Sequence, residues 1–192
     1  MLNVVLVEPE IPANTGNIGR TCVLTGSRLH LVGPLGFDLS QKAVQRAGLG
    51  YWQSLDLTTY RSWDDFVKRA LKGTGSHVHL LTKRAERTYV QSTYLQNDWL
   101  IFGQESGGLP KKLLDAHPDL CERIPMYGDD VLSNASTWHQ THENLHPELQ
   151  RDICGNFIDE RVGQISSLNL SNAVAIVVYE ALRQLGFPNM NA

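Results

Sequence analysis

The chain has 192 residues, of which 42% are hydrophobic and 19% charged, and its formal net charge is −3. This length and apolar content suffice for one sizeable core, so we expect a single domain over residues 1–192. The negative net charge argues against a protein that coats nucleic acid without specificity, because such binding depends on many phosphate contacts. Small basic clusters such as Lys83-Arg84 still leave local contact with nucleic acid open.

The apolar amino terminus, residues 1–7, is much shorter than the roughly 20 residues of a membrane span and has no basic lead-in. No other apolar run approaches that length, so we expect a cytoplasmic protein without a membrane partner. The three cysteines, Cys22, Cys121 and Cys154, are odd in number and far apart. This pattern predicts reduced thiols rather than a disulfide framework.

The apolar pattern alternates between strands and helices along the chain. Residues 2–7 are nearly all apolar, as is typical of a strand covered on both faces of a parallel sheet. A loop follows and includes residues 14–17, and after it come a short helix at 18–24 and a strand at 29–32. Further expected elements are a helix at 40–47, a helix from Ser62 through Leu71, strands at 77–81 and 99–102, a helix opened by Pro110, a last strand at 123–126, and a helix at 174–185 stopped by Gly186.

This alternation predicts an α/β fold with a mainly parallel sheet flanked by helices. Ligands of such sheets bind at the carboxyl ends of the strands. Three segments rich in glycine or asparagine follow strands, at 14–19, at 103–108 and within 124–172. If these strand ends are neighbours, the three segments form one site.

The small polar residues at 166–173 precede the last helix and have two interpretations. They could grip a ligand with the unpaired N–H groups of the helix start, or Ser171 and Asn172 could simply cap a core helix. The turn alone favours the cap.

Residues 129–162 interrupt the alternation with a long polar stretch, in which only 143–153 has a helical pattern. Such a segment is typical of a lid, a binding loop or disorder. Its histidines could ligate zinc together with Cys154, but their spacing matches no known motif and solvated side chains are the simpler interpretation. These histidines are His139, His142 and His146.

Several nucleotide-dependent and hydrolytic classes lack their motifs. Residues 16–19 do not begin with the Gly-x-Gly of a dinucleotide site, and no phosphate-binding P-loop occurs. Residues 104–108 look superficially like a serine-hydrolase loop but lack the spacing of the nucleophile elbow.

Three segments in order resemble the motifs of the SPOUT RNA 2′-O-methyltransferases. They are Asn-Thr-Gly-Asn-Ile-Gly-Arg at 14–20, Leu-Ile-Phe-Gly-Gln-Glu-Ser-Gly-Gly-Leu-Pro at 100–110, and Ile-Pro-Met at 124–126 followed by Ser-Leu-Asn-Leu-Ser-Asn-Ala at 167–173. The chain is most similar to the small members that modify the wobble cytidine or uridine of tRNA. The resemblance implies a C-terminal trefoil-knotted SPOUT methyltransferase fold, a homodimer, and the tRNA anticodon stem-loop as partner.

The same resemblance implies S-adenosylmethionine as methyl donor, bound in the knot without any metal. Aliphatic side chains can enclose an adenine, and glycine at 103 lets backbone approach the ligand closely. By position, the residues that would line this pocket are Leu81, Gly103, Ile124, Ser167 and Leu168.

Arg20 matches the catalytic arginine of the family. Methyl transfer requires an aligned ribose hydroxyl that loses its proton as it attacks. A charged guanidinium offers no acceptor, so we expect Arg20 to bind the neighbouring phosphate and stabilise the developing alkoxide, with that phosphate or water taking the proton. The resemblance implies further roles for Asn14 and Glu105 in holding Arg20 and the ribose, for Ser167 and Asn169 in shaping the turn, and for Tyr179 facing substrate or a second subunit.

The chain departs from its relatives in two places. They join the last strand to the turn by a few residues, whereas here residues 129–162 intervene, and Ser166 stands where they often carry arginine. Two alternatives therefore stay open: a non-catalytic homodimer that binds tRNA or the cofactor, and a 2′-O-methyltransferase acting on ribosomal RNA, for which an added RNA-binding domain would be usual.

Overall fold

The computed structural model describes residues 1–39, 50–73, 75–126, 167–188 and 190. The chain divides into two compact units, one formed by Met1–Ile124 with Asn169–Ala192 and the other by Pro125–Leu168. The sheet and the helices named below belong to the first unit. The placement of the second unit relative to the first is not defined. No helix in the described ranges is long and apolar enough to cross a membrane.

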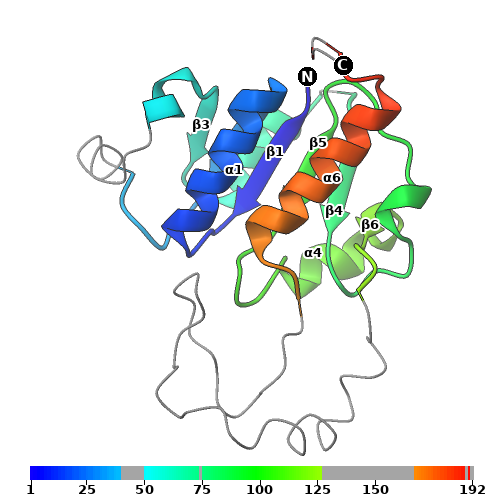
Figure 1. The fold of residues 1–192 in the computed structure, drawn as a ribbon. Helices are drawn as coiled ribbons and strands as arrows, with labels where there is room; N and C mark the ends of the chain where they lie inside the picture. Colours follow the sequence, from blue (N-terminus) through cyan, green and yellow to red (C-terminus); the bar gives the residue numbers. More distant parts are fainter. Residues whose placement is uncertain (40–49, 74, 127–166, 189, 191–192) are drawn as a thin grey trace, which may run out of the picture. The chain divides into compact units, whose positions relative to one another are not determined.

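Six strands form one parallel sheet in the order β3-β2-β1-β5-β4-β6 (Figure 1). The parallel pairing confirms the predicted α/β architecture. Strand β1 lies near the middle of the sheet, and all five of its residues are buried. The strands are β1 (Asn3–Val7), β2 (Arg28–Val32), β3 (Leu57–Tyr60), β4 (Val78–Leu81), β5 (Trp99–Phe102) and β6 (Cys121–Glu122).

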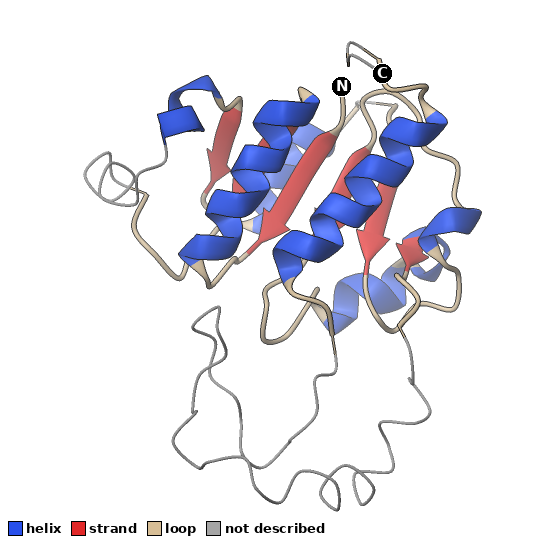
Figure 2. Cartoon of the chain, viewed as in Figure 1, coloured by secondary structure: helices blue, strands red, loops and turns tan. Residues whose placement is uncertain are grey.

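Helices cover both faces of the sheet (Figure 2). Val4 and Leu6 of β1 point to a core shared with α1 (Pro12–Thr25) and α6 (Leu170–Gln184). Val5 and Val7 point to the opposite core, which includes residues of α3 (Trp63–Phe66) and α4 (Lys111–Ala116). Because successive side chains alternate between faces, two covered faces explain the continuous apolar run of β1. Shorter helical segments are η1 (Gly50–Ser54), η2 (Val67–Leu71), η3 (Tyr89–Gln91) and η4 (Pro118–Leu120).

The prediction of a loop at residues 14–17 is wrong, because α1 already begins at Pro12. Proline fits the first position of a helix, where its missing N–H would be unpaired in any case. Asn14, Thr15 and Gly16 are all buried within the helix, so tertiary packing overrides their turn-like composition. The helix ends at Thr25, one residue beyond the predicted end at 24, and Gly26 after it has a left-handed φ of 64°.

Other boundaries also differ from the sequence pattern. Strand β3 was not predicted, and the last strand is Cys121–Glu122 rather than 123–126. Arg123 adds only an isolated bridge to Thr88, and Pro125 has no N–H with which to continue a ladder. The predicted helix start at Ser62 is confirmed, since the Ser62 hydroxyl caps the helix by accepting a hydrogen bond from the Asp65 N–H at 3.3 Å.

The last helix begins at Leu170, and its cap is Asn169 rather than Ser171 or Asn172. The Asn169 side-chain oxygen accepts hydrogen bonds from the Ser171 N–H at 2.9 Å and from the Ser171 hydroxyl at 2.7 Å. The predicted helices at 40–47 and 143–153, the polar stretch 129–162 and its possible zinc ligands lie outside the described residues.

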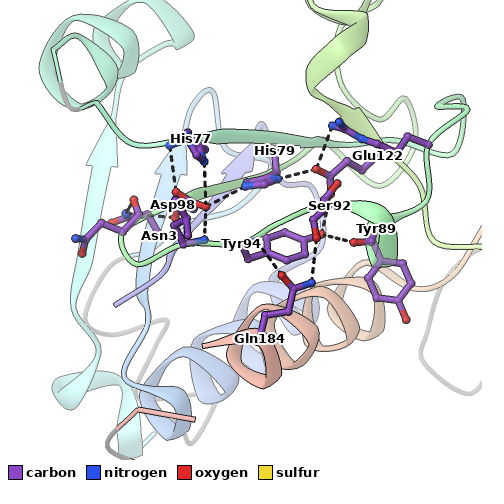
Figure 3. A network of polar contacts seen from close by, with 12 residues as sticks. Asn3, His77, His79, Tyr89, Ser92, Tyr94, Asp98, Glu122 and Gln184 are labelled. Atoms are coloured by element: carbon purple, nitrogen blue, oxygen red, sulfur yellow. Dashed lines mark hydrogen bonds and ion pairs between the residues drawn. The ribbon is translucent and has the colours of Figure 1, made fainter. Parts of the chain in front are cut away.

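A buried network of charged and polar groups links β4, β6, the entry to β5 and α6 (Figure 3). The His79 ring lies between two buried carboxylates, with Nδ1 at 2.6 Å from Glu122 and Nε2 at 3.2 Å from Asp98. Tyr94 donates its hydroxyl to Glu122 at 2.7 Å, and Gln184 of α6 accepts from the Tyr94 N–H at 3.0 Å. Burial opposes a charge on His79, but hydrogen bonds and attraction to the two carboxylates outweigh it and raise the His79 pKa.

Candidate active site

A continuous chain of hydrogen bonds joins three segments that are far apart in the sequence. The Asn169 side-chain amide donates to the Asn14 side-chain oxygen at 2.9 Å, and the Asn14 amide donates to the Glu105 carboxylate at 3.0 Å. These residues come from the cap of α6, the first turn of α1 and the loop after β5. The structure thus brings together three of the residues that the resemblance singled out.

The groups at the two ends of this chain fix the orientation of both amides. The Asn169 oxygen is held by the Ser171 backbone N–H, so its NH₂ group must face Asn14. The Asn14 oxygen receives that NH₂ group, so the Asn14 NH₂ group must face Glu105. A carboxylate, which only accepts, is therefore the right partner at the end of the chain.

Glu105 also fastens the segment that leads into α1. Its carboxylate accepts the backbone N–H groups of Glu10 at 2.8 Å and Ile11 at 3.3 Å. The negative charge is thus placed at the amino end of a helix, where the helix dipole favours it. In return, the Glu10 carboxylate accepts the Ser106 N–H at 2.9 Å and the Ser106 hydroxyl at 2.8 Å. Each of the two loops thus supplies a carboxylate that accepts hydrogen bonds from the other loop.

Arg20 lies on α1 and is exposed. Six residues separate it from Asn14, which corresponds to about 9 Å along a helix and to a different helical face. Asn14 is 4% exposed whereas Arg20 is exposed. The Arg20 guanidinium lies over the ring of Tyr51, with its central carbon 5.1 Å from the ring centroid. Through their hydrogen bonds, Asn14 and Glu105 fix the start of the helix that carries Arg20.

The predicted cofactor residues of the first unit lie at the carboxyl ends of three neighbouring strands. Leu81 ends β4 and pairs in register with Phe102, which directly precedes Gly103, and also with Glu122 of β6. Ile124 follows two residues later and packs, partly buried, against the same core as Leu81. This is the edge of the sheet at which ligands of parallel sheets bind.

Gly103 allows the loop after β5 to fold back on itself. A Cβ at this position would overlap the backbone of Gly108 and Leu109. The turn is closed by the Gly108 N–H, which donates to the Gln104 carbonyl at 2.9 Å. Any side chain larger than hydrogen would open this turn and displace Glu105, which lies within it.

The remaining residues of the expected site have less defined surroundings. Ser167 and Leu168 belong to the second unit and are exposed within the structure. Tyr179 on α6 is 46% exposed, as a residue facing a substrate or another subunit would be.

Sequence reasoning missed Glu10, Ser106 and Tyr51. Glu10 stands between a strand and a helix-opening proline, a position from which a carboxylate can reach neighbouring loops, and this was its available signal. Tyr51 has no such signal, because its contact with Arg20 depends on how η1 packs against α1.

Comparison with known proteins identifies the family. The chain matches the SpoU rRNA methylase family over residues 1–136. The chain belongs to the SpoU methylase family. Within it, the chain is 39% identical over 190 residues to a Geobacillus stearothermophilus protein and 39% identical over 191 residues to one from Yersinia pestis. The matches cover 99% of both chains in the first case, and 98% of this chain and 96% of the relative in the second. The Yersinia pestis relative bears the name tRNA (cytidine(34)-2′-O)-methyltransferase.

Solved structures agree with this membership in the SpoU methylase family. A structure described as giving insights into the 2′-OH methylation of C/U34 on tRNA is 34% identical, with a TM-score of 0.72 and 97% of both chains covered. The methyltransferase AviRb from Streptomyces viridochromogenes, solved with S-adenosylmethionine, has a TM-score of 0.66 at 23% identity and shares the fold. That match covers 96% of this chain and 58% of AviRb.

Proposed function

We propose that this SpoU methylase transfers a methyl group from S-adenosylmethionine to the ribose 2′-hydroxyl of the wobble nucleotide, cytidine or uridine 34, of tRNA. The observation that carries the proposal is the hydrogen-bonded chain from Asn169 through Asn14 to Glu105, which unites all three family motifs. The Yersinia pestis relative, which bears the name of this activity and is matched over 96% of its length, supports the choice of substrate.

Arg20 is the residue on which the chemistry depends in this proposal. It is exposed on α1, so its guanidinium can reach an RNA phosphate and the 2′-oxygen beside it. A guanidinium donates several hydrogen bonds in a fixed plane and accepts none while charged. It therefore stabilises negative charge as the hydroxyl loses its proton, and the RNA phosphate or water takes that proton.

The edge of the sheet at β4, β5 and β6 suits the proposed cofactor. Leu81 and Ile124 offer aliphatic surface for an adenine, and the loop that folds back on itself at Gly103 presents backbone groups at the same strand ends. S-adenosylmethionine supplies the methyl group when it is bound there. By the family resemblance, Ser167 and Leu168 are also proposed to contact the cofactor.

We extend the proposal to the assembly that the family resemblance implies. The chain would form a single cytoplasmic domain with a trefoil knot at its carboxyl end, and two copies would form a homodimer. Large exposed apolar side chains on both α1 and α6 support the homodimer, since they favour a covered surface. These side chains are Leu24, Ile176 and Tyr179.

Replacement of Arg20 tests the proposed catalysis. In Arg20→Ala we expect unchanged binding of S-adenosylmethionine by calorimetry and a loss of at least about 100-fold in kcat on unmodified tRNA, because an oxyanion-stabilising donor contributes that much. Arg28→Ala removes an equally charged side chain that is paired with Asp56 at 2.9 Å, and it should leave kcat within twofold. Undiminished turnover by Arg20→Ala would refute the role of Arg20.

The unmodified protein distinguishes the two alternative functions. Cofactor binding without turnover on any RNA would identify a non-catalytic binder, and turnover on ribosomal RNA alone would show that tRNA is the wrong substrate.

A further inference from the structure

Tyr51 makes two contacts with the turn of α1 that carries Arg20. Its hydroxyl donates to the Gly16 carbonyl, and its ring lies under the Arg20 guanidinium at 5.1 Å. In an α-helix the carbonyl of residue 16 also pairs with the N–H of residue 20. Tyr51 thus holds the backbone and the side chain of the same helical turn.

The segment η1 that carries Tyr51 packs closely on a glycine of α1. A Cβ on Gly19 would lie 3.1 Å from the Trp52 ring and 3.2 Å from the Leu55 side chain. Leu55 is 9% exposed and belongs to the core shared by α1 and α6. Glycine at this position therefore lets η1 lie directly against the helix, which places the neighbouring Tyr51 beside Arg20.

An exposed arginine without such a contact samples many rotamers and loses much conformational freedom whenever it binds a ligand. A ring face restricts the guanidinium through cation–π attraction, and the N–H donors lie in the plane of the guanidinium, where one side-chain hydrogen bond joins Arg20 to Tyr51. We propose that Tyr51 is a positioning residue that holds the Arg20 guanidinium in the orientation needed for the RNA phosphate and the 2′-oxygen. The inference rests on the proposed function, because it acts through Arg20.

The phenol works as a hydrogen-bond donor and a ring face rather than as a base. Burial raises the pKa of Tyr51, against the opposing effects of the Arg20 charge and of a side-chain hydrogen bond with Arg20. The hydroxyl therefore stays protonated at neutral pH and donates to Gly16. Removal of the hydroxyl should leave the pH profile of kcat unchanged.

Two substitutions separate the ring from the hydroxyl. Tyr51→Leu removes both contacts, and we expect kcat on unmodified tRNA to fall about 10-fold while the KM for S-adenosylmethionine stays within twofold. Tyr51→Phe keeps the ring under Arg20, and we expect kcat within about threefold of the unmodified protein, with the same pH profile. A kcat for Tyr51→Leu within twofold of the unmodified protein would overturn the proposal.

The chain offers a matched control at Tyr60. Arg69 lies over the Tyr60 ring at 5.0 Å, and Tyr60 is only 8% exposed in the opposite core. Tyr60→Leu should lower the Tm more than Tyr51→Leu and still leave kcat within twofold. If Tyr60→Leu does not fold, Tyr60→Phe, which removes the hydroxyl and its 3.1 Å contact to His30 but keeps the ring under Arg69, is the matched control for Tyr51→Phe. A parallel loss of Tm and kcat in both tyrosine series would mean that Tyr51 has a merely structural role.

A double substitution tests whether Tyr51 acts through Arg20. In the Arg20→Lys background the ring has no guanidinium to orient, so adding Tyr51→Leu should cost less than twofold in kcat. A further 10-fold loss in that background would contradict the positioning role. Full activity of Arg20→Ala would refute the proposed function itself, whereas an inactive Arg20→Ala with a fully active Tyr51→Leu would refute only the role of Tyr51.

Discussion

Substitution of Glu105 by glutamine tests the hydrogen-bond chain at its end point. The Glu105 carboxylate receives three donors: the N–H groups of Glu10 and Ile11 and the Asn14 amide. None of the three can become an acceptor, because two are backbone groups and Asn169 fixes the orientation of the third. In Glu105→Gln, the new NH₂ group, itself a donor, must therefore face at least one of these three donors and cannot form a hydrogen bond with it.

The less costly orientation of the new amide faces the Glu10 N–H and loses the bond that is now 2.8 Å long. A hydrogen bond to a charged group contributes about 1.5–3 kcal/mol. We expect Glu105→Gln to lower the free energy of unfolding by about 2 kcal/mol. If the same 2 kcal/mol is lost from the stabilisation of the transition state, kcat falls by about 30-fold. Urea denaturation and single-turnover methyl transfer measure the two effects.

Glu10→Gln is the matched control, because Glu10 makes the reciprocal hydrogen bonds between the same two loops. Its carboxylate binds the Ser106 N–H and the Ser106 hydroxyl, and a hydroxyl can accept as well as donate. The oxygen of the new glutamine can still accept the Ser106 N–H, while its NH₂ group donates to the rotated Ser106 hydroxyl. We therefore expect the free energy of unfolding to fall by less than about 1 kcal/mol. A Glu10→Gln protein as unstable as Glu105→Gln would refute the reasoning.

Three further changes have expected outcomes. Gly103→Ala should weaken S-adenosylmethionine binding at least about 10-fold by calorimetry, because its Cβ meets fixed backbone, whereas Gly107→Ala meets only the movable Gln104 side chain at 2.8 Å and should bind normally. Burial lowers the pKa of His30 to about 4, below its unfolded value of about 6.5. The contribution of this shift to the free energy of unfolding, at most about 3 kcal/mol, is therefore present above pH 6.5 and is lost as the pH falls toward 4. His30→Gln should flatten the urea stability profile in that window, and an unchanged slope would contradict this. The pKa of His79 is raised, so its pH dependence is opposite: its contribution to the free energy of unfolding is complete below about pH 6.5 and is lost as the pH rises through the folded-state pKa. The destabilisation by His79→Gln should therefore be largest near pH 6 and shrink as the pH rises above that folded-state pKa.

The strands that carry a continuous apolar run could be predicted from the sequence, and weakly patterned elements could not. β1 and β5 are buried on both faces, so every residue in them is selected for burial. β3 is a four-residue edge strand with two threonines, and its pattern does not differ from that of a loop. The start of α1 was missed because Asn14 and Gly16 favour turns locally, whereas Glu105 and the packing of η1 hold them in a helix.

The sequence indicated which segments form the candidate site, but not which hydrogen bonds join them. Motif order pointed to the segments around Asn14, Glu105 and Asn169, which the structure joins by direct hydrogen bonds. It could not show that Asn169, rather than Ser171, caps the last helix, because both residue types are good caps and only the partner Asn14 distinguishes them.

Mass-spectrometric mapping of 2′-O-methylation in tRNA, after incubation of unmodified tRNA with the purified protein and S-adenosylmethionine, tests the central claim most directly. We predict one methyl group on the ribose of nucleotide 34 in tRNAs with cytidine or uridine at that position, and none when Arg20→Ala replaces the unmodified protein. Methylation at another nucleotide, or no methylation of tRNA by a protein that binds S-adenosylmethionine, would contradict the proposed function.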